Sequence, residues 1–274
     1  MNASLVQTPL GTIHCPQKGL GDPILLVHGI YPGASRHEWD HNIGPLASNF
    51  QVNAPDLLGF GESDAPHRTF TVQLYHHLLR DLIATHIGKP TIVVAAGVSC
   101  AAAVRLAVYD DQLVSKLVLV APTERPHEMP SVAERFTQFV YGTLAMGGGI
   151  YESVNEPSAI REYLEDQYAD VKRIPKDAVK KLKYESERPN ALYPFISLVT
   201  GFYNLDVYRP LRYVRKPTLL VWGDAADVPP ADEVLAPAAW SQGKRIEIIE
   251  GAKLWPHVEQ SAKFNDTVRA FGME

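Results

Sequence analysis

The sequence has few cysteines and no excess of positive charge. Its two cysteines, Cys15 and Cys100, belong to no CxxC motif and no Cys/His cluster, so we expect neither a disulfide framework nor a structural zinc site. The chain carries 26 Lys and Arg against 31 Asp and Glu, which gives a net charge of −5. A weakly acidic chain without a basic segment is a poor partner for nucleic acid or an anionic membrane, and we expect neither.

Long hydrophobic runs are also absent. The longest stretch of low polarity, residues 91–104, ends at Arg105 and is shorter than the roughly 18 residues that a membrane-spanning helix needs. The first residues have neither the cationic start nor the apolar centre of a signal peptide. We therefore expect no membrane insertion and a cytoplasmic location. The adjacent His76 and His77 have no third ligand nearby, so we expect no metal and no cofactor.

What the sequence does contain is the pattern of a large α/β domain. With 274 residues, of which 46% are hydrophobic, the chain is long enough to bury a large core. Continuous Val-, Ile- and Leu-rich runs alternate with segments of helical periodicity, which is typical of a parallel sheet with helices on both faces. After a hairpin around residues 8–11, we predict strands at 23–28, 50–55, 90–96, 116–121, 217–222 and 245–249, and helices at 71–87, 98–109 and 257–271.

The segment from residue 124 to residue 210 shows no convincing strand. It has three helical starts, at Pro130, Pro157 and Pro175, and it holds many aromatic residues. We predict that residues 124–210 form a helical cap, inserted after the sixth strand, and that 1–123 and 211–274 form the core. The predicted fold class is a mostly parallel, doubly wound α/β sheet with this cap.

Four segments, in this order along the chain, resemble motifs of the α/β-hydrolase superfamily. They are the HG turn of residues 25–29 with the Pro-Gly-Ala-Ser loop after it, the D-x-x-G-x-G-x-S turn of 56–63, the strand–turn–helix of 91–107, and Trp-Gly-Asp at 222–224 followed by 251–259. The first segment looks most like the oxyanion loop of carbon–carbon bond hydrolases that act on ring-cleavage products. The resemblance spans nearly the whole chain and implies the α/β-hydrolase fold.

The resemblance also implies where a catalytic serine would lie. In the nucleophile elbow G-x-S-x-G, a sharp turn between strand and helix lifts the serine above the sheet, beside N–H groups that stabilise an oxyanion. An alignment without gaps on the strands 90–94 and 117–120 places Gly97 at that position. Glycine preserves the strained backbone of the elbow but supplies no hydroxyl.

The other two positions of the triad are substituted in the same way. The acid of the superfamily usually follows the Trp of W-G-x-x-D by four residues, and here that residue is Ala226. The histidine of G-x-G-H-x-x-x-x-E is replaced by Leu254, whereas Glu259 matches the motif. We therefore expect no conventional Ser-His-Asp chemistry at Gly97, Ala226 and Leu254.

A displaced triad is the alternative. Ser99, Asp227 and His257 lie two, one and three residues beyond the substituted positions. These shifts run in unrelated directions, so bringing a nucleophile and a base within about 2.6–3.2 Å would need an accidental reconvergence. Otherwise Ser99 caps the helix or lines the pocket floor, Asp227 is a surface charge and His257 begins the last helix. Glu124, after the strand 116–121, is a further candidate acid or a solvated loop residue.

Part of a binding site is expected to remain. The N–H of Val98, after the elbow, and that of Ile30 or Tyr31, after the HG turn, should converge and favour a carbonyl oxygen, an enolate or a carboxylate. His28 is expected to be structural. Other candidates to line the pocket are Gly97, Ser99, His37, Trp39 and Trp255, although His37 and Trp39 could instead begin a surface helix.

Three functions remain open from the sequence. The favoured one is a degenerate α/β hydrolase that binds a small apolar molecule bearing a carbonyl or carboxylate, as a carrier, a sensor or a non-hydrolytic enzyme of isomerase, lyase or cyclase type. The second is a working hydrolase of ester or carbon–carbon bonds that uses the displaced residues. The third is a scaffold for a protein partner with a vestigial pocket. The ligand and the oligomeric state are left open.

Overall fold

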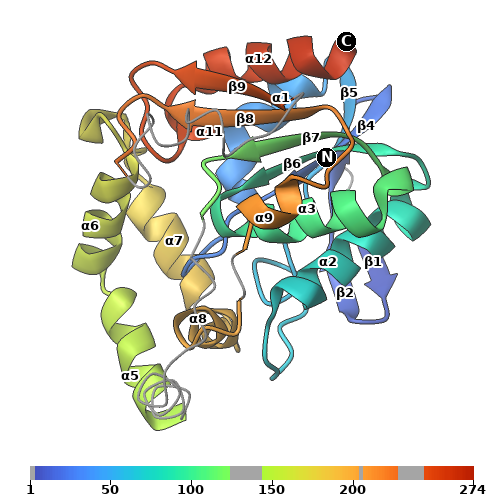
Figure 1. Ribbon diagram of the computed structural model, residues 1–274. Coiled ribbons are helices and arrows are strands. Elements are labelled where there is room, and N and C mark those ends of the chain that lie inside the picture. Colours follow the sequence, from blue (N-terminus) through green and yellow to red (C-terminus); the bar gives the residue numbers. More distant parts are fainter. Residues whose placement is uncertain (1–3, 124–143, 204–205, 228–243) are drawn as a thin grey trace.

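The computed structural model describes residues 4–123, 144–203, 206–227 and 244–274. Its centre is a seven-stranded sheet in the order β3-β5-β4-β6-β7-β8-β9 (Figure 1). The sheet is parallel except for β3, which pairs antiparallel with β5. The strands are β3 Gln17–Lys18, β4 Asp22–Val27, β5 Phe50–Asn53, β6 Thr91–Ala96, β7 Val114–Val120, β8 Thr218–Gly223 and β9 Lys244–Ile249. The predicted α/β-hydrolase fold class is confirmed.

Helices cover both faces of the sheet. In Figure 1, α1 (Asp40–Leu46), α11 (Pro256–Glu259) and α12 (Ser261–Met273) lie on one face, and α2 (Val72–Asp81) and α3 (Cys100–Tyr109) lie on the other. The central strands are therefore buried on both sides. Along β6, Val93 and Ala95 pack into one apolar core, while Ile92 and Val94 pack into the other. This two-sided burial explains why these strands are continuous apolar runs in the sequence.

The N-terminal hairpin forms where it was predicted, with β1 at Leu5–Thr8 and β2 at Gly11–His14. The predicted helix 71–87 is present, but its last part, η2 Leu82–Ile87, is a π-helix that ends at Gly88 in a left-handed conformation. The helix predicted at 98–109 begins with a short 3-10 turn, η3 (Gly97–Ser99), before α3.

The predicted C-terminal helix 257–271 is wrong in one respect, because the structure divides it into α11 and α12. The break is at Gln260, whose backbone has φ −123° and ψ 47°. Its side-chain amide donates a hydrogen bond to the carbonyl of Gly251, 2.9 Å away. The break lets α11 turn back towards the loop that follows β9.

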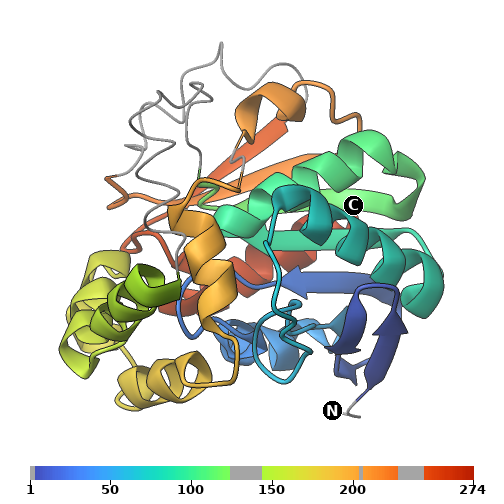
Figure 2. The same cartoon turned by 90° about the horizontal axis from the view of Figure 1, so that it is seen from below.

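Between β7 and β8 the described residues are helical, and no strand occurs among them (Figure 2). The helices are α5 Leu144–Val154, α6 Pro157–Gln167, α7 Ala178–Ser186, α8 Leu192–Val199 and α9 Tyr208–Leu211, with the 3-10 turn η5 at Val171–Arg173. The predicted start at Pro130 lies outside the described residues. The division into a core and a cap at residues 124 and 210 stays a prediction.

The cap helix α7 approaches the core closely at Gly33. This glycine has φ +77°, and a Cβ at this position would collide with the backbone of Leu182 in α7. A glycine in the Pro-Gly-Ala loop therefore permits both the left-handed turn and the contact between cap and core.

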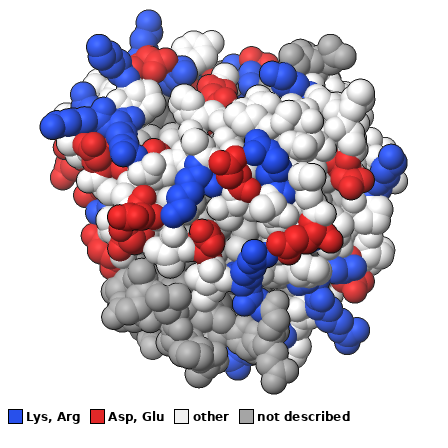
Figure 3. All heavy atoms as spheres, turned by 90° about the horizontal axis from the view of Figure 1, so that it is seen from above, with Lys and Arg blue, Asp and Glu red and all other residues white. Residues whose placement is uncertain are grey.

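No helix of the described part of the chain is long and apolar enough to cross a membrane. On the face shown in Figure 3, Lys and Arg side chains are interspersed with Asp and Glu, as the nearly balanced composition suggests.

A buried carboxylate joins the cap to the loop after β9. Glu259 is 7% exposed, and its Oε2 accepts hydrogen bonds from the N–H groups of Ala169 and Lys253, 3.0 and 3.1 Å away. Its Oε1 accepts from the N–H of Asp170 at 2.8 Å. Ala169 and Asp170 follow α6, so one side chain fixes the end of a cap helix to the core.

We predict that Glu259→Ala lowers the free energy of unfolding by about 1–3 kcal/mol, because three backbone N–H groups in a partly buried site lose a charged acceptor. Urea unfolding followed by circular dichroism measures this change. The control is Glu165→Ala, which removes an exposed carboxylate from α6 and should change the stability by no more than about 0.5 kcal/mol. Equal effects of the two variants would contradict the role given to Glu259.

Candidate functional site

Gly97 occupies the sharp turn between β6 and the helical segment that follows. Its φ is +52°, a left-handed conformation that favours glycine. The turn is closed by the N–H of Thr123, which donates to the carbonyl of Gly97 at 3.3 Å. Among the described residues, a Cβ at position 97 would meet only the Oγ1 of Thr123, at 3.7 Å. The space beside Gly97 can thus take a small side chain, although the backbone would be strained.

Ser99 lies one turn further on, with its hydroxyl directed back into the core. The residue is 1% exposed, and its Oγ donates a 2.6 Å hydrogen bond to the carbonyl of His28. The hydroxyl therefore connects the start of α3 to the HG turn after β4. Ser99 makes no side-chain cap for α3.

His28 has a structural role in this turn. Its Nε2 accepts a hydrogen bond from the N–H of Leu57 at 3.0 Å, and its Nδ1 lies 2.7 Å from the carbonyl of Gly29. Burial lowers the pKa of His28, which fits a neutral ring with its proton on Nδ1. The ring holds the D-x-x-G-x-G-x-S turn against the end of β4.

Ala226 and Leu254 lie in the loops after β8 and β9. Ala226 is 6% exposed, and Leu254 is half-buried, with its N–H donating to the carbonyl of Gln167 at 3.1 Å. The side chain of the neighbouring Asp227 is 65% exposed and pairs with the Nζ of Lys253 at 3.1 Å. Asp227 is therefore a surface charge, as one of the two interpretations of the sequence expected.

His257 is fully buried and pairs with a residue that the sequence did not identify. Its Nε2 lies 2.8 Å from the Oε1 of Glu38, which is in the 3-10 turn η1 (Arg36–Trp39). The Oε2 of Glu38 accepts hydrogen bonds from the N–H of Gly29 and the hydroxyl of Tyr31, at 2.8 and 2.9 Å. No Lys or Arg of the described ranges pairs with Glu38.

Glu38 remains ionised in this position. Burial raises the pKa of its carboxyl, but the hydrogen bond and charge of His257 and the N–H of Gly29 together lower it further, so that the pKa lies below its ordinary value. Glu38 could not have been identified from local sequence, because its partner His257 is 219 residues away. In the sequence, Glu38 is a lone acid between His37 and Trp39, and such a residue forms no recognisable motif.

Ser99, Asp227 and His257 are not brought together by the structure. Each side chain is hydrogen-bonded or paired elsewhere: Ser99 with the carbonyl of His28, Asp227 with Lys253, and His257 with Glu38. The other candidate acid, Glu124, lies outside the described residues.

Two backbone N–H groups remain available near the elbow. Val98 is the second residue of η3, and the N–H groups of a first helical turn have no partner within the helix. Ile30 follows the HG turn, and no hydrogen bond to its N–H occurs among the described residues. The N–H of the preceding Gly29, in contrast, is used by Glu38.

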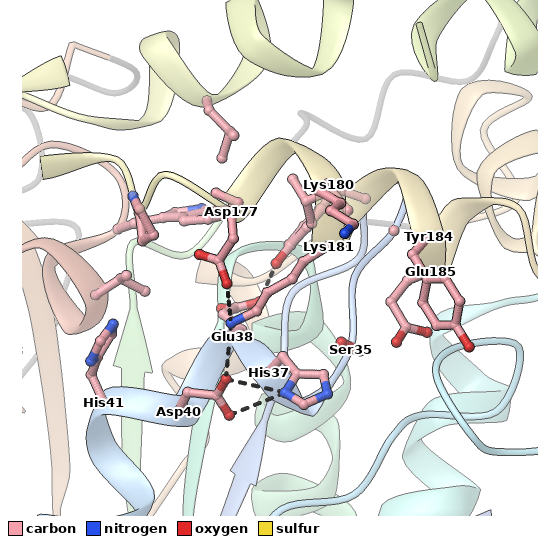
Figure 4. Close-up of a pocket in the computed structure, with 18 of the residues that line it drawn as sticks. Ser35, His37, Glu38, Asp40, His41, Asp177, Lys180, Lys181, Tyr184 and Glu185 are labelled. Atoms are coloured by element: carbon pink, nitrogen blue, oxygen red, sulfur yellow. Dashed lines mark hydrogen bonds and ion pairs between the residues drawn. The ribbon is translucent and has the colours of Figure 1, made fainter. Parts of the chain in front are cut away.

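A cleft of about 620 Å³ opens between the loop after β4 and the cap helices α6 and α7 (Figure 4). Tyr31, His37 and Trp255 line it, so three of the candidates from the sequence share one cavity. Trp39 does not, because it is fully buried and packs against His257, with ring centroids 4.5 Å apart and an angle of 42° between the ring planes. Nothing in the sequence pointed to Lys180, Lys181 and Glu185 of α7, or to Asp177 directly before this helix, as residues of the cleft.

No group of three or more His, Cys, Asp or Glu residues that could hold a metal ion occurs in the part of the chain that the structure describes. His76 pairs instead with Asp110, with 2.6 Å between Nε2 and Oδ2. Cys100 is fully buried, and burial raises the pKa of its thiol far above the ordinary value. It packs as a small core residue.

Comparison with known proteins identifies the family of the chain. A family model described as "Alpha/beta hydrolase family" matches residues 24–267. The chain belongs to this family.

One curated relative is an uncharacterised protein of Mycobacterium tuberculosis, which is 27% identical, with the match covering 92% of this chain and 76% of the relative. Another is the 2-hydroxymuconate semialdehyde hydrolase of a Pseudomonas species, which is 25% identical, with the match covering 92% of this chain and 87% of the relative. Among solved structures, a meta-cleavage product hydrolase from Pseudomonas fluorescens superposes with a TM-score of 0.78 at 18% identity, covering 97% of each chain.

The contact between Glu38 and His257 predicts a strong energetic coupling. Removing one partner leaves the other polar group buried and unpaired, so Glu38→Ala and His257→Ala should each lower the free energy of unfolding by about 3–5 kcal/mol. The double variant should cost less than the sum of the two, with a coupling of about 1–3 kcal/mol from a double-mutant cycle in urea. The exposed pair Arg269 and Asp266 serves as the control cycle, with a coupling below about 0.5 kcal/mol. Strict additivity at Glu38 and His257 would refute the coupling.

The lowered pKa of Glu38 predicts a dependence of stability on pH. Because the folded pKa lies below the ordinary value of 4.5, the ionised carboxylate stabilises the folded state above that value, and this contribution disappears as the pH falls through the folded pKa. The difference in stability between wild type and Glu38→Gln should therefore be constant near neutral pH and shrink below about pH 4.5. Urea unfolding between pH 3 and 7 tests this, and a difference that grows towards acid pH would contradict it.

Proposed function

We propose that this member of the alpha/beta hydrolase family does not hydrolyse its ligand through a Ser-His-Asp triad. It binds a small apolar molecule that bears a carbonyl group, either as a carrier or sensor or as a non-hydrolytic enzyme of isomerase, lyase or cyclase type. The observation that carries this proposal is Gly97, which has the left-handed backbone of a nucleophile elbow at its sharp turn and no side chain to attack with.

The contacts of the neighbouring polar residues support the same view. The hydroxyl of Ser99 is buried against the carbonyl of His28, and the imidazole of His257 is held by Glu38. A nucleophile needs a base within hydrogen-bond distance, and the base needs an orienting group. The side chains of Ser99 and His257 would both have to break buried hydrogen bonds before they could contact each other. This argues against a catalytic triad displaced to these residues.

The proposed ligand group is a neutral carbonyl rather than a carboxylate. The N–H groups of Val98 and Ile30 are suited to a carbonyl oxygen or an enolate. The carboxylate of Glu38 lies 2.8 Å from the N–H of Gly29, directly beside Ile30 in the chain. A permanent negative charge so close to the loop disfavours a carboxylate, which stays ionised throughout binding, whereas an enolate carries its charge only transiently and on an oxygen that accepts hydrogen bonds from both N–H groups.

Such a site supports reactions that need only stabilisation of an enolate or transfer of a proton. In triad-deleted serine hydrolases, binding and the oxyanion hole alone retain roughly 10³–10⁴-fold acceleration over water. A non-hydrolytic reaction of this kind would use the N–H groups of Val98 and Ile30 without any covalent intermediate.

A working hydrolase is the second candidate, because the characterised relatives are named as hydrolases, including a 2-hydroxymuconate semialdehyde hydrolase. In that case Ser99 would be the nucleophile. A protein scaffold with a vestigial pocket has no comparable support, since among the described residues a Cβ at Gly97 would meet only the Oγ1 of Thr123, at 3.7 Å, so that these residues do not fill the space beside the elbow.

The test is labelling with a fluorophosphonate, together with assays on p-nitrophenyl esters and a chromogenic ring-cleavage product. We expect no labelling and no turnover by wild type or by Ser99→Ala. Stoichiometric labelling of wild type that is lost in Ser99→Ala would overturn the proposal and establish the second candidate.

A gain-of-function variant serves as the positive control for the same assay. Gly97→Ser, combined with Ala226→Asp and Leu254→His, should become labelled at position 97, since the space beside Gly97 accepts a small side chain. The matched control is Ser99→Thr, which keeps a hydroxyl two residues away and adds only a methyl group, and it should remain unlabelled.

A further inference from the structure

The cleft between the loop after β4 and helix α7 is distinct from the elbow. Neither Gly97 nor Val98, Ile30 or Leu254 lines it. It is formed by η1 and the start of α1 on one side and by α6, α7 and Trp255 on the other (Figure 4). A ligand in this cavity therefore contacts a different set of residues from one held by the oxyanion-loop N–H groups.

Aromatic rings form the inner wall of the cleft. Tyr31, Tyr168 and Trp255 line it together, with the ring of Trp255 5.2 Å from that of Tyr31 and 6.0 Å from that of Tyr168. Burial raises the pKa of the Tyr168 hydroxyl far above its ordinary value, so the rings are neutral at physiological pH. Adjacent neutral aromatic rings attract a cation through their negative faces.

The floor behind this wall is a buried carboxylate with a histidine partner. Glu38 also lines the cleft, its side chain is only 1% exposed, and its Oε1 lies 2.8 Å from the Nε2 of His257. The hydroxyl of Tyr31 donates to this carboxylate at 2.9 Å. That hydrogen bond directs electron density towards the ring of Tyr31 and links the charged floor to the aromatic wall.

The mouth of the cleft has more acidic than basic side chains. Asp40, Glu62, Asp177 and Glu185 line it, against Lys180, Lys181 and Arg188. Two of these three cations are already paired. Lys181 lies 3.1 Å from Asp177 and 3.8 Å from Asp40, and Arg188 lies 2.8 Å from Glu185. With Glu38 included, five carboxylates and three Lys or Arg side chains surround the cavity, and two of the carboxylates also have a histidine partner: Glu38 has His257 and Asp40 has His37.

We propose that this cleft is a binding site for an organic cation, an alkyl- or arylammonium group that packs on Tyr31, Tyr168 and Trp255 with its charge facing Glu38. The apolar part of the ligand lies against Leu164 and Leu182, which also line the cavity. This site goes beyond the proposed carbonyl-binding function at the elbow and does not depend on it, since the two involve separate residues.

The experiment is isothermal titration of the full chain with benzyltrimethylammonium chloride, and with 3-phenylpropanoate and benzyl alcohol as the anionic and neutral probes of similar size. We expect one-to-one binding of the ammonium probe at submillimolar to millimolar concentration and at least tenfold weaker binding of the other two. No binding of the ammonium probe up to 10 mM, or equal affinity for the anion, overturns the proposal.

Variants locate the site. Glu38→Gln, which preserves the shape of the side chain, and Trp255→Leu should each weaken binding of the ammonium probe by about tenfold. Asp177→Asn removes a surface carboxylate at the mouth of the cleft and takes the place of Glu38→Gln if that variant fails to fold. It should weaken binding of the ammonium probe by about two- to threefold at low salt. Glu165→Gln, on the outer face of α6, is the matched control and should have no effect. Unchanged affinity in Trp255→Leu and in Asp177→Asn refutes the assignment.

Discussion

The buried carboxylate of Glu38 is the interaction on which the arrangement of the site depends. It is held by three donors from two distant parts of the chain, namely the N–H of Gly29 and the hydroxyl of Tyr31 in the loop after β4, and the imidazole of His257 in α11. Through these contacts the loop after β4 is fixed to α11, which follows the loop of Leu254. A buried charge between these two loops fixes both the geometry and the electrostatics of the space beside the HG turn.

The fold could be predicted because it is encoded locally. The runs that became β6, β7 and β8 are apolar on both faces, and the turn at Gly97 is marked by a glycine between a strand and an Ala-rich helix. The break at Gln260 was missed, since nothing in the periodicity of residues 257–271 shows that an amide would bond back to Gly251. Short elements such as β3, with two residues, carry no pattern of their own.

Residues of the site could be predicted only within the segments that carry motifs of the family. The elbow, the HG turn and the segment ending in Glu259 gave the positions of Gly97, Val98 and Ile30. The role of Glu38 depends on a contact across 219 residues, and the cleft depends on how α7 docks on Gly33. Both are properties of tertiary packing. The same limit applies to Trp39, which the sequence placed with the pocket and which packs instead against His257 and Phe264 in the core.

Glu259 is one of the attachments that hold the helices after β7 on the sheet. Its carboxylate binds the N–H groups of Ala169 and Asp170, immediately after α6, and that of Lys253. Further along the chain, the hydroxyl of Ser197 in α8 accepts a hydrogen bond from the N–H of Phe70 at 2.9 Å. Because α7 lies between these two attachments in the sequence, the width of the cleft beside it is set by contacts on both of its sides.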